Sequence, residues 1–102
     1  MENDLKIRAQ VKKILDLVKS VAPGKSVELR VPPYGAIQCV VGGNHRRGTP
    51  PNTVEMSGQT LVRLINEPSL WSSLCDSGEV RASGLLSDLS NLFAQAAAKY
   101  RA

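Results

Sequence analysis

Few side chains in this sequence could do nucleophilic or metal chemistry, and their spacing matches no catalytic or metal-binding motif. The chain has one histidine, His45, and two cysteines, Cys39 and Cys75, which lie far apart without a CxxC motif. A Cys39–His45 pair is conceivable, whereas zinc would need both cysteines, the histidine and a carboxylate to converge. Cys39 shares a predicted strand face with Ile37 and Val41, where a thiol is usually an inert part of the core. The sequence therefore predicts a protein that is not an enzyme and holds no metal or cofactor.

The most polar segment, residues 42–52, has the sequence GGNHRRGTPPN and contains two adjacent arginines. Arg46 and Arg47 present planar guanidinium groups that suit phosphate or carboxylate, and the prolines that follow limit the ordering cost of binding. This predicts an anion-binding loop for phospholipid head groups, an acidic protein or nucleic acid. Nucleic acid is disfavoured because no aromatic side chains are interleaved. Two alternatives are a structural loop, with an arginine paired to Glu55 or Glu28, and a solvated turn.

The middle of the chain has the spacing of a strand, two short helices and a second strand. Residues 53–57 alternate in polarity and end at Ser57, whose hydroxyl can cap the following helix. Pro68 separates the two helical stretches, and Gly78 can end the second one with a positive φ. Residues 79–83 alternate again. A connection of this length allows the two strands to lie parallel in one sheet through a right-handed crossover.

Two helices and a hairpin flank this central unit. Residues 4–21 repeat apolar side chains at helical spacing. We predict that this basic amphipathic helix packs on the sheet, with binding to a membrane surface as the alternative. Residues 26–31 and 36–41 alternate as the two strands of a hairpin around a diproline turn. A final helix is predicted from residue 87 or 88 towards Tyr100.

The composition fits one domain spanning residues 1–102. The apolar share is 42%, and 13 basic against 9 acidic residues give a formal charge of +4, a modest excess that favours acidic partners. No apolar run approaches the ~18 residues that a transmembrane helix needs. The charged N-terminal segment has no signal-peptide core, and two isolated cysteines are typical of free thiols. These features predict a cytoplasmic protein.

The order and spacing of these elements resemble the sterol carrier protein-like family, in particular a short bacterial branch. The segments that carry the resemblance to its C-terminal half are TVEMS, TLVRLI, SLWSSL, SGEVRASG and LLSDLSNLF. The bacterial branch shows a pattern similar to SVELRVPP, AIQC and RRGTPPN. The resemblance covers about residues 23–93. It implies an α+β fold with a mixed sheet of four or five strands and helices mainly on one face. The family commonly has a further strand near residues 42–52.

The resemblance also implies a carrier role, with an apolar pocket between helices and sheet that takes a sterol, a fatty acid or an acyl-CoA. On this chain its lining would be Met56, Leu61, Leu64, Trp71, Leu74, Leu89, Leu92 and Phe93. The alternative is a closed core of the same side chains, in an interaction or regulatory module that binds an acidic partner, a membrane surface or nucleic acid through the Arg46–Arg47 loop. An empty cavity of ~300 Å³ would cost about 7 kcal/mol at ~24 cal/mol per Å³. A large pocket would therefore be ligand-filled, hydrated or collapsed.

Overall fold

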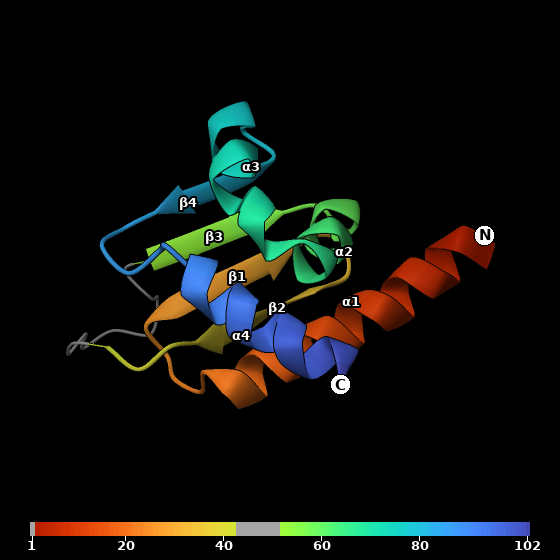
Figure 1. The fold of residues 1–102 in the computed structure, drawn as a ribbon, viewed down its shortest axis with the longest axis horizontal. Coiled ribbons are helices and arrows are strands. Elements are labelled where there is room, and N and C mark those ends of the chain that lie inside the picture. Colours follow the sequence, from red (N-terminus) through yellow and green to blue (C-terminus); the bar gives the residue numbers. More distant parts are fainter. Residues whose placement is uncertain (1, 43–51) are drawn as a thin grey trace.

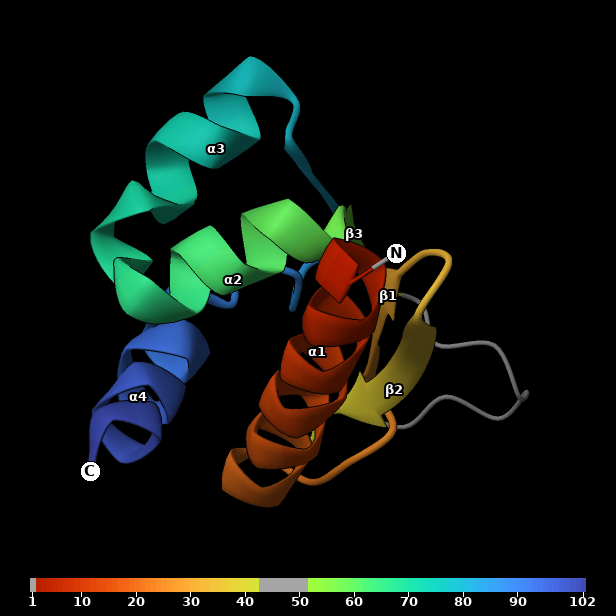
Figure 2. The same ribbon diagram turned by 90° about the vertical axis from the view of Figure 1, so that its right-hand side faces the viewer.

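Among the residues that the structure describes, four strands form one mixed sheet with the helices on one of its faces (Figure 1, Figure 2). The structure is a computed structural model, and it describes residues 2–42 and 52–102. The strands are β1 (Val27–Val31), β2 (Gly35–Cys39), β3 (Asn52–Met56) and β4 (Val80–Ser83), in the order β2-β1-β3-β4. β1 pairs antiparallel with β2 and parallel with β3. The predicted α+β fold with a mixed sheet is confirmed.

The predicted parallel arrangement of the strands on either side of the central helices is wrong, because β3 and β4 are antiparallel neighbours. Met56 at the end of β3 pairs with Val80 at the start of β4, so the connection returns to the end from which it left. α2 (Gly58–Asn66) leads away from that end, and η1 (Pro68–Leu70) with α3 (Trp71–Ser77) leads back. A single crossover helix would have delivered the chain to the opposite end. The prediction that both strands share one sheet is confirmed.

The hairpin of β1 and β2 is shorter than the predicted one. β2 ends at Cys39, and Val41 is 80% exposed, so the prediction that Val41 shares a buried face with Ile37 and Cys39 is wrong. The cause lies at Val40, which has a φ of +68° and donates its N–H to the carbonyl of Ala22 at 2.8 Å. This bond ties the chain to the loop after the first helix, and the alternation of the strand stops there.

The first and last helices have slightly different bounds from the predicted ones. α1 (Glu2–Val21) begins two residues earlier, and α4 (Ser90–Arg101) begins after residue 88. Asp88 nevertheless serves the start of α4, because its Oδ1 accepts the N–H of Ser90 at 3.0 Å. The same hydrogen bond lowers the pKa of Asp88, since it stabilises the carboxylate.

The predicted helix signals at Ser57 and Gly78 are confirmed. Ser57 Oγ accepts the N–H of Thr60 at 3.1 Å and so satisfies a free donor at the start of α2. Gly78 follows α3 with a φ of +83°, in the left-handed region that glycine adopts at little cost. These two residues fix where the paired helices between β3 and β4 begin and end.

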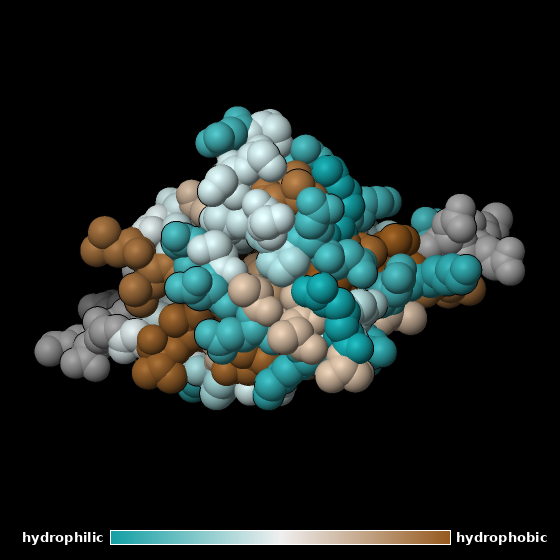
Figure 3. Space-filling view, viewed as in Figure 1, coloured by the Kyte–Doolittle hydropathy of each residue, from teal (hydrophilic) through white to brown (hydrophobic). Residues whose placement is uncertain are grey.

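One hydrophobic core fills the space between the helices and the sheet. α1 buries Val11, Ile14, Leu15 and Val18, so its apolar face packs in the core as predicted. Within residues 2–42 and 52–102, no helix is long and apolar enough to cross a membrane. Apolar surface also gathers at the end of the molecule where β4 leads into α4 (Figure 3).

Candidate functional site

The structure brings the eight predicted pocket residues together in one buried cluster on the helix-covered side of the sheet. Each of them is 8% exposed or less. They belong to β3, α2, α3, α4 and the residue before α4: Met56, Leu61, Leu64, Trp71, Leu74, Leu89, Leu92 and Phe93. The rings of Trp71 and Phe93 stack with their centroids 6.0 Å apart and an interplanar angle of 29°. We call this group the Trp71–Phe93 cluster.

The periodicity of each element directs these side chains inward. In α2, Leu61, Leu64 and Ile65 follow at helical spacing and are fully buried. In β3, Val54 and Met56 lie two residues apart and therefore face the helices together. The side chains of the cluster pack against one another and against the rest of the core, so the cluster is closed in this structure.

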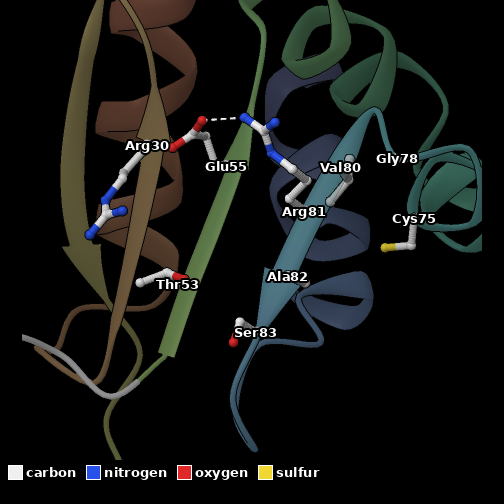
Figure 4. Close-up of a pocket in the computed structure, with 9 residues that line it drawn as sticks. All are labelled: Arg30, Thr53, Glu55, Cys75, Gly78, Val80, Arg81, Ala82 and Ser83. Atoms are coloured by element: carbon white, nitrogen blue, oxygen red, sulfur yellow. Dashed lines mark hydrogen bonds and ion pairs between the residues drawn. The ribbon is translucent and has the colours of Figure 1, made fainter.

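A surface hollow of about 460 Å³ lies at the edge of the sheet formed by β4 (Figure 4). Gly78, Val80 and Ala82 border it along β4 and the turn before it. The half-buried thiol of Cys75 lies beside it on α3. Polar side chains border it on the helix-free face of the sheet: Arg30, Thr53, Glu55, Arg81 and Ser83. The hollow therefore reaches from the open face of the sheet, around β4, to α3.

The helix-free face of the sheet holds its charges in ion pairs. Arg30, Glu55 and Arg81 are cross-strand neighbours in one row, since Glu55 is the register partner of both arginines. The Arg81 guanidinium bonds to the Glu55 carboxylate, and Arg30 Nε donates to Glu28 Oε2 at 2.5 Å. The hydrogen bond to Glu28 raises the pKa of Arg30. Glu28 and Glu55 are the two carboxylates named above as partners for an arginine of a structural 42–52 loop. In the structure each of them pairs with an arginine of the sheet.

Both cysteines are free thiols in environments that disfavour the thiolate. Burial raises the pKa of Cys39 to about 11. The pKa of Cys75 is raised by burial first and then by the negative charges of Asp76 and Asp88. Protonated thiols are poor nucleophiles and poor metal ligands. Within residues 2–42 and 52–102, no group of three or more His, Cys, Asp or Glu residues could hold a metal ion.

The segment that contains His45, Arg46 and Arg47 lies outside the described residues. The anion-binding loop therefore stays a prediction, and the Cys39–His45 pair that the sequence made conceivable is not tested. The further strand that the family commonly has near residues 42–52 is likewise not tested, because residues 43–51 are not described.

A comparison with protein-family models gives a match over residues 4–94 to a family described as bacterial SCP ortholog, where SCP denotes sterol carrier protein. The chain belongs to this family. Its membership confirms the predicted resemblance, which rested on the order and spacing of short segments. No curated protein matches the chain.

The fold of this chain is similar to that of a solved UbiJ-SCP2 ubiquinone synthesis protein. The TM-score is 0.54 and the sequence identity is 20%, over 96% of this chain and 91% of that chain. At this identity the similarity supports the fold alone.

Sequence reasoning missed Asn52, a buried polar residue at the start of β3. Its Nδ2 donates to the carbonyl of Ser26 at 2.8 Å, and its Oδ1 accepts the N–H of Leu86 at 2.9 Å. Asn52 lies on the inward face with Val54 and Met56, so an amide at an inward strand position was the available signal. The Asn52 amide thus joins two loops at one end of the sheet.

Proposed function

We propose that this chain is a non-catalytic binding domain for a lipid-like ligand, such as a sterol, a fatty acid or an acyl-CoA, held at the Trp71–Phe93 cluster. The observation that carries the proposal is the position of the cluster: one helical layer covers it on one sheet face, which is the position that the family resemblance implies for a pocket. The raised pKa values of Cys39 and Cys75 support a role without catalysis. Free thiols also favour the cytoplasm. In this proposal the 102 residues act as one domain.

The wall that would move to admit a ligand is α3. This seven-residue helix buries only Trp71 and Leu74, and it packs beside β4 at the edge of the sheet. Exposing the two side chains would cost roughly 3–6 kcal/mol, whereas burying eight methylene groups of an acyl chain would contribute about 6 kcal/mol. The cost of exposing Trp71 and Leu74 is therefore similar to the gain from burying the acyl chain, so a ligand could stabilise an arrangement in which α3 has moved away from the sheet. The hollow beside Cys75 is where the ligand would enter.

Titration of the protein with fatty acids, a sterol analogue and an acyl-CoA tests the proposal, because Trp71 is the only tryptophan and stacks inside the cluster. We expect a saturable change in its fluorescence emission with at least one ligand class. Native mass spectrometry of the freshly purified protein should show the same class bound, and extraction would identify it.

Leu92→Asp places a charge in the cluster and should abolish the fluorescence response. Leu5→Asp is the matched control, since Leu5 is 68% exposed on α1 and should leave the response unchanged. Circular dichroism of both variants separates lost binding from lost folding. If no lipid class gives a saturable signal with the folded wild-type protein, the ligand-binding proposal is wrong.

The closed packing of the cluster supports a second candidate function, an interaction or regulatory module that acts only through its surface. No ligand would then separate α3 from the sheet. The partners predicted for the Arg46–Arg47 loop would serve this role: an acidic protein, a transient acidic membrane surface or, less favoured, nucleic acid.

A further inference from the structure

The turn between β4 and α4 presents leucines where turns ordinarily have polar residues. Residues 84–87 form a tight turn, in which the N–H of Ser87 bonds to the carbonyl of Gly84 at 3.2 Å. Its two central residues are Leu85, which is fully exposed, and Leu86, which is 40% exposed. Gly, Pro, Asn, Asp and Ser dominate such positions because each satisfies a backbone requirement. Leucines at turn positions that usually carry these residues therefore indicate a role other than folding.

Hydrogen bonds from two buried polar side chains, Asn52 and Ser87, hold this turn in one conformation. Asn52 accepts the N–H of Leu86 and donates to the carbonyl of Ser26, so the turn is fixed to the sheet and to the loop after α1. Ser87 is buried and its Oγ donates to the carbonyl of Gly84 at 2.7 Å. Gly84 has a φ of +107°, and a Cβ there would lie 2.2 Å from Asn52 Oδ1. The turn is therefore built rigidly, with Leu85 held away from the core.

A third apolar side chain lies on a segment that passes directly beside this turn. Gly42 is so close to Leu86 that a Cβ on Gly42 would lie 2.5 Å from Leu86 Cδ1. Val41, the residue before Gly42, is 80% exposed. We define Val41, Leu85 and Leu86 as the apolar tip. Figure 3 shows apolar surface at the end of the molecule where this turn lies.

We propose that the apolar tip inserts into the surface of a phospholipid membrane. Three side chains cannot supply the ~800 Å² per partner that a specific protein interface buries. A fluid lipid phase needs no complementary pocket, so a small, convex and rigid tip suits it. The charged residues nearest to Leu85 and Leu86 along the chain are Arg81 and Asp88, both exposed and of opposite sign. Insertion should therefore depend little on salt, unlike docking of a cationic loop. This inference does not rest on the proposed lipid-ligand function.

Flotation with phosphatidylcholine vesicles, with and without phosphatidylglycerol, tests the proposal at millimolar lipid. The wild-type protein should float with both compositions, and on phosphatidylcholine alone salt should change its bound fraction less than twofold. Leu85→Asn should lower the partition coefficient about tenfold, because one leucine no longer enters the apolar phase. Asn is compatible with turns, so we expect the variant to fold normally. Leu5→Asn is the matched control at the far end of α1, and its partition should equal that of the wild type.

A fluorescent probe gives an independent measurement of depth. Leu85→Cys in a Cys75→Ser background, labelled with an environment-sensitive dye, should shift to the blue on vesicles, while Leu5→Cys in the same background should not. Cys39 is buried and should remain unlabelled. Unchanged flotation of folded Leu85→Asn overturns the proposal. So does flotation that needs phosphatidylglycerol and disappears with salt, which would indicate a cationic site, or dimerisation through Leu85 without lipid, which would indicate a second copy.

Discussion

At the scale of residues, one buried amide organises an end of the molecule. Asn52 is 3% exposed and bonds to backbone groups 26 and 34 residues away in the sequence. The Asn52 amide supplies each of those backbone groups with a hydrogen-bond partner beside the core. A buried polar side chain of this kind is retained because the cost of an unmade hydrogen bond exceeds the cost of burying the amide.

Asn52→Ala should lower the free energy of unfolding by roughly 2–4 kcal/mol, because it removes the partners of the Ser26 carbonyl and the Leu86 N–H. Urea denaturation measures the change. Thr53→Ala is the matched control, since Thr53 is the next residue of β3 and faces the other side of the sheet; we expect a change within about 1 kcal/mol. An unchanged unfolding midpoint for Asn52→Ala would mean that other contacts hold the turn.

At the scale of elements, the paired helices between β3 and β4 decide both the topology and the candidate site. α2 buries five residues and packs against α1, whereas α3 buries two and packs beside β4. The two helices that connect β3 to β4 therefore differ in how many residues they bury. Regions with little buried apolar surface open at lower free energy, so α3 is the element expected to move.

The backbone amides of α3 should exchange hydrogen roughly tenfold faster than those of α4, because α3 has fewer buried side chains to lose on opening. Mass spectrometry of peptides covering residues 71–77 and 90–101 measures the two rates. A lipid that saturates the Trp71 signal should slow exchange in the first peptide only. Equal protection of both helices would exclude α3 as the moving wall.

At the scale of the whole molecule, two different surfaces could meet a membrane. The predicted Arg46–Arg47 loop would bind anions through charge, and the apolar tip would enter the lipid through burial. The formal charge of +4 adds a weak, unspecific attraction to acidic surfaces. Salt separates these contributions, since it screens exposed charges and leaves apolar insertion intact.

Arg46→Ala combined with Arg47→Ala should reduce retention on phosphatidylglycerol vesicles while the melting temperature changes by only about 2 °C. Added salt should reproduce the loss in the wild type. Lys6→Ala with Lys19→Ala removes the same charge from α1 and should retain most of the binding. A fall in stability with unchanged binding would instead indicate a structural loop, and no change in either would leave a solvated turn.

The sequence by itself determined the local elements of this protein. Ser57 caps a helix and Gly78 ends one through backbone groups only a few residues away, so their residue types suffice. Alternation in the predicted strands at residues 26–31 and 53–57 marks which side chains face inward, because the strand period is fixed at two. The family resemblance followed from the order of these elements, which is also a property of the sequence.

Only the tertiary structure decided how those elements meet. Periodicity is the same for parallel and antiparallel strands, so the direction of β4 beside β3 depended on where α3 returns the chain. Val41 continued an alternating pattern, yet the bond from Val40 to Ala22 took it out of the sheet. Closure of the Trp71–Phe93 cluster and exposure of Leu85 likewise depend on contacts between residues distant in sequence. Such contacts leave no periodic signal, because each partner satisfies its own local pattern whether or not they meet.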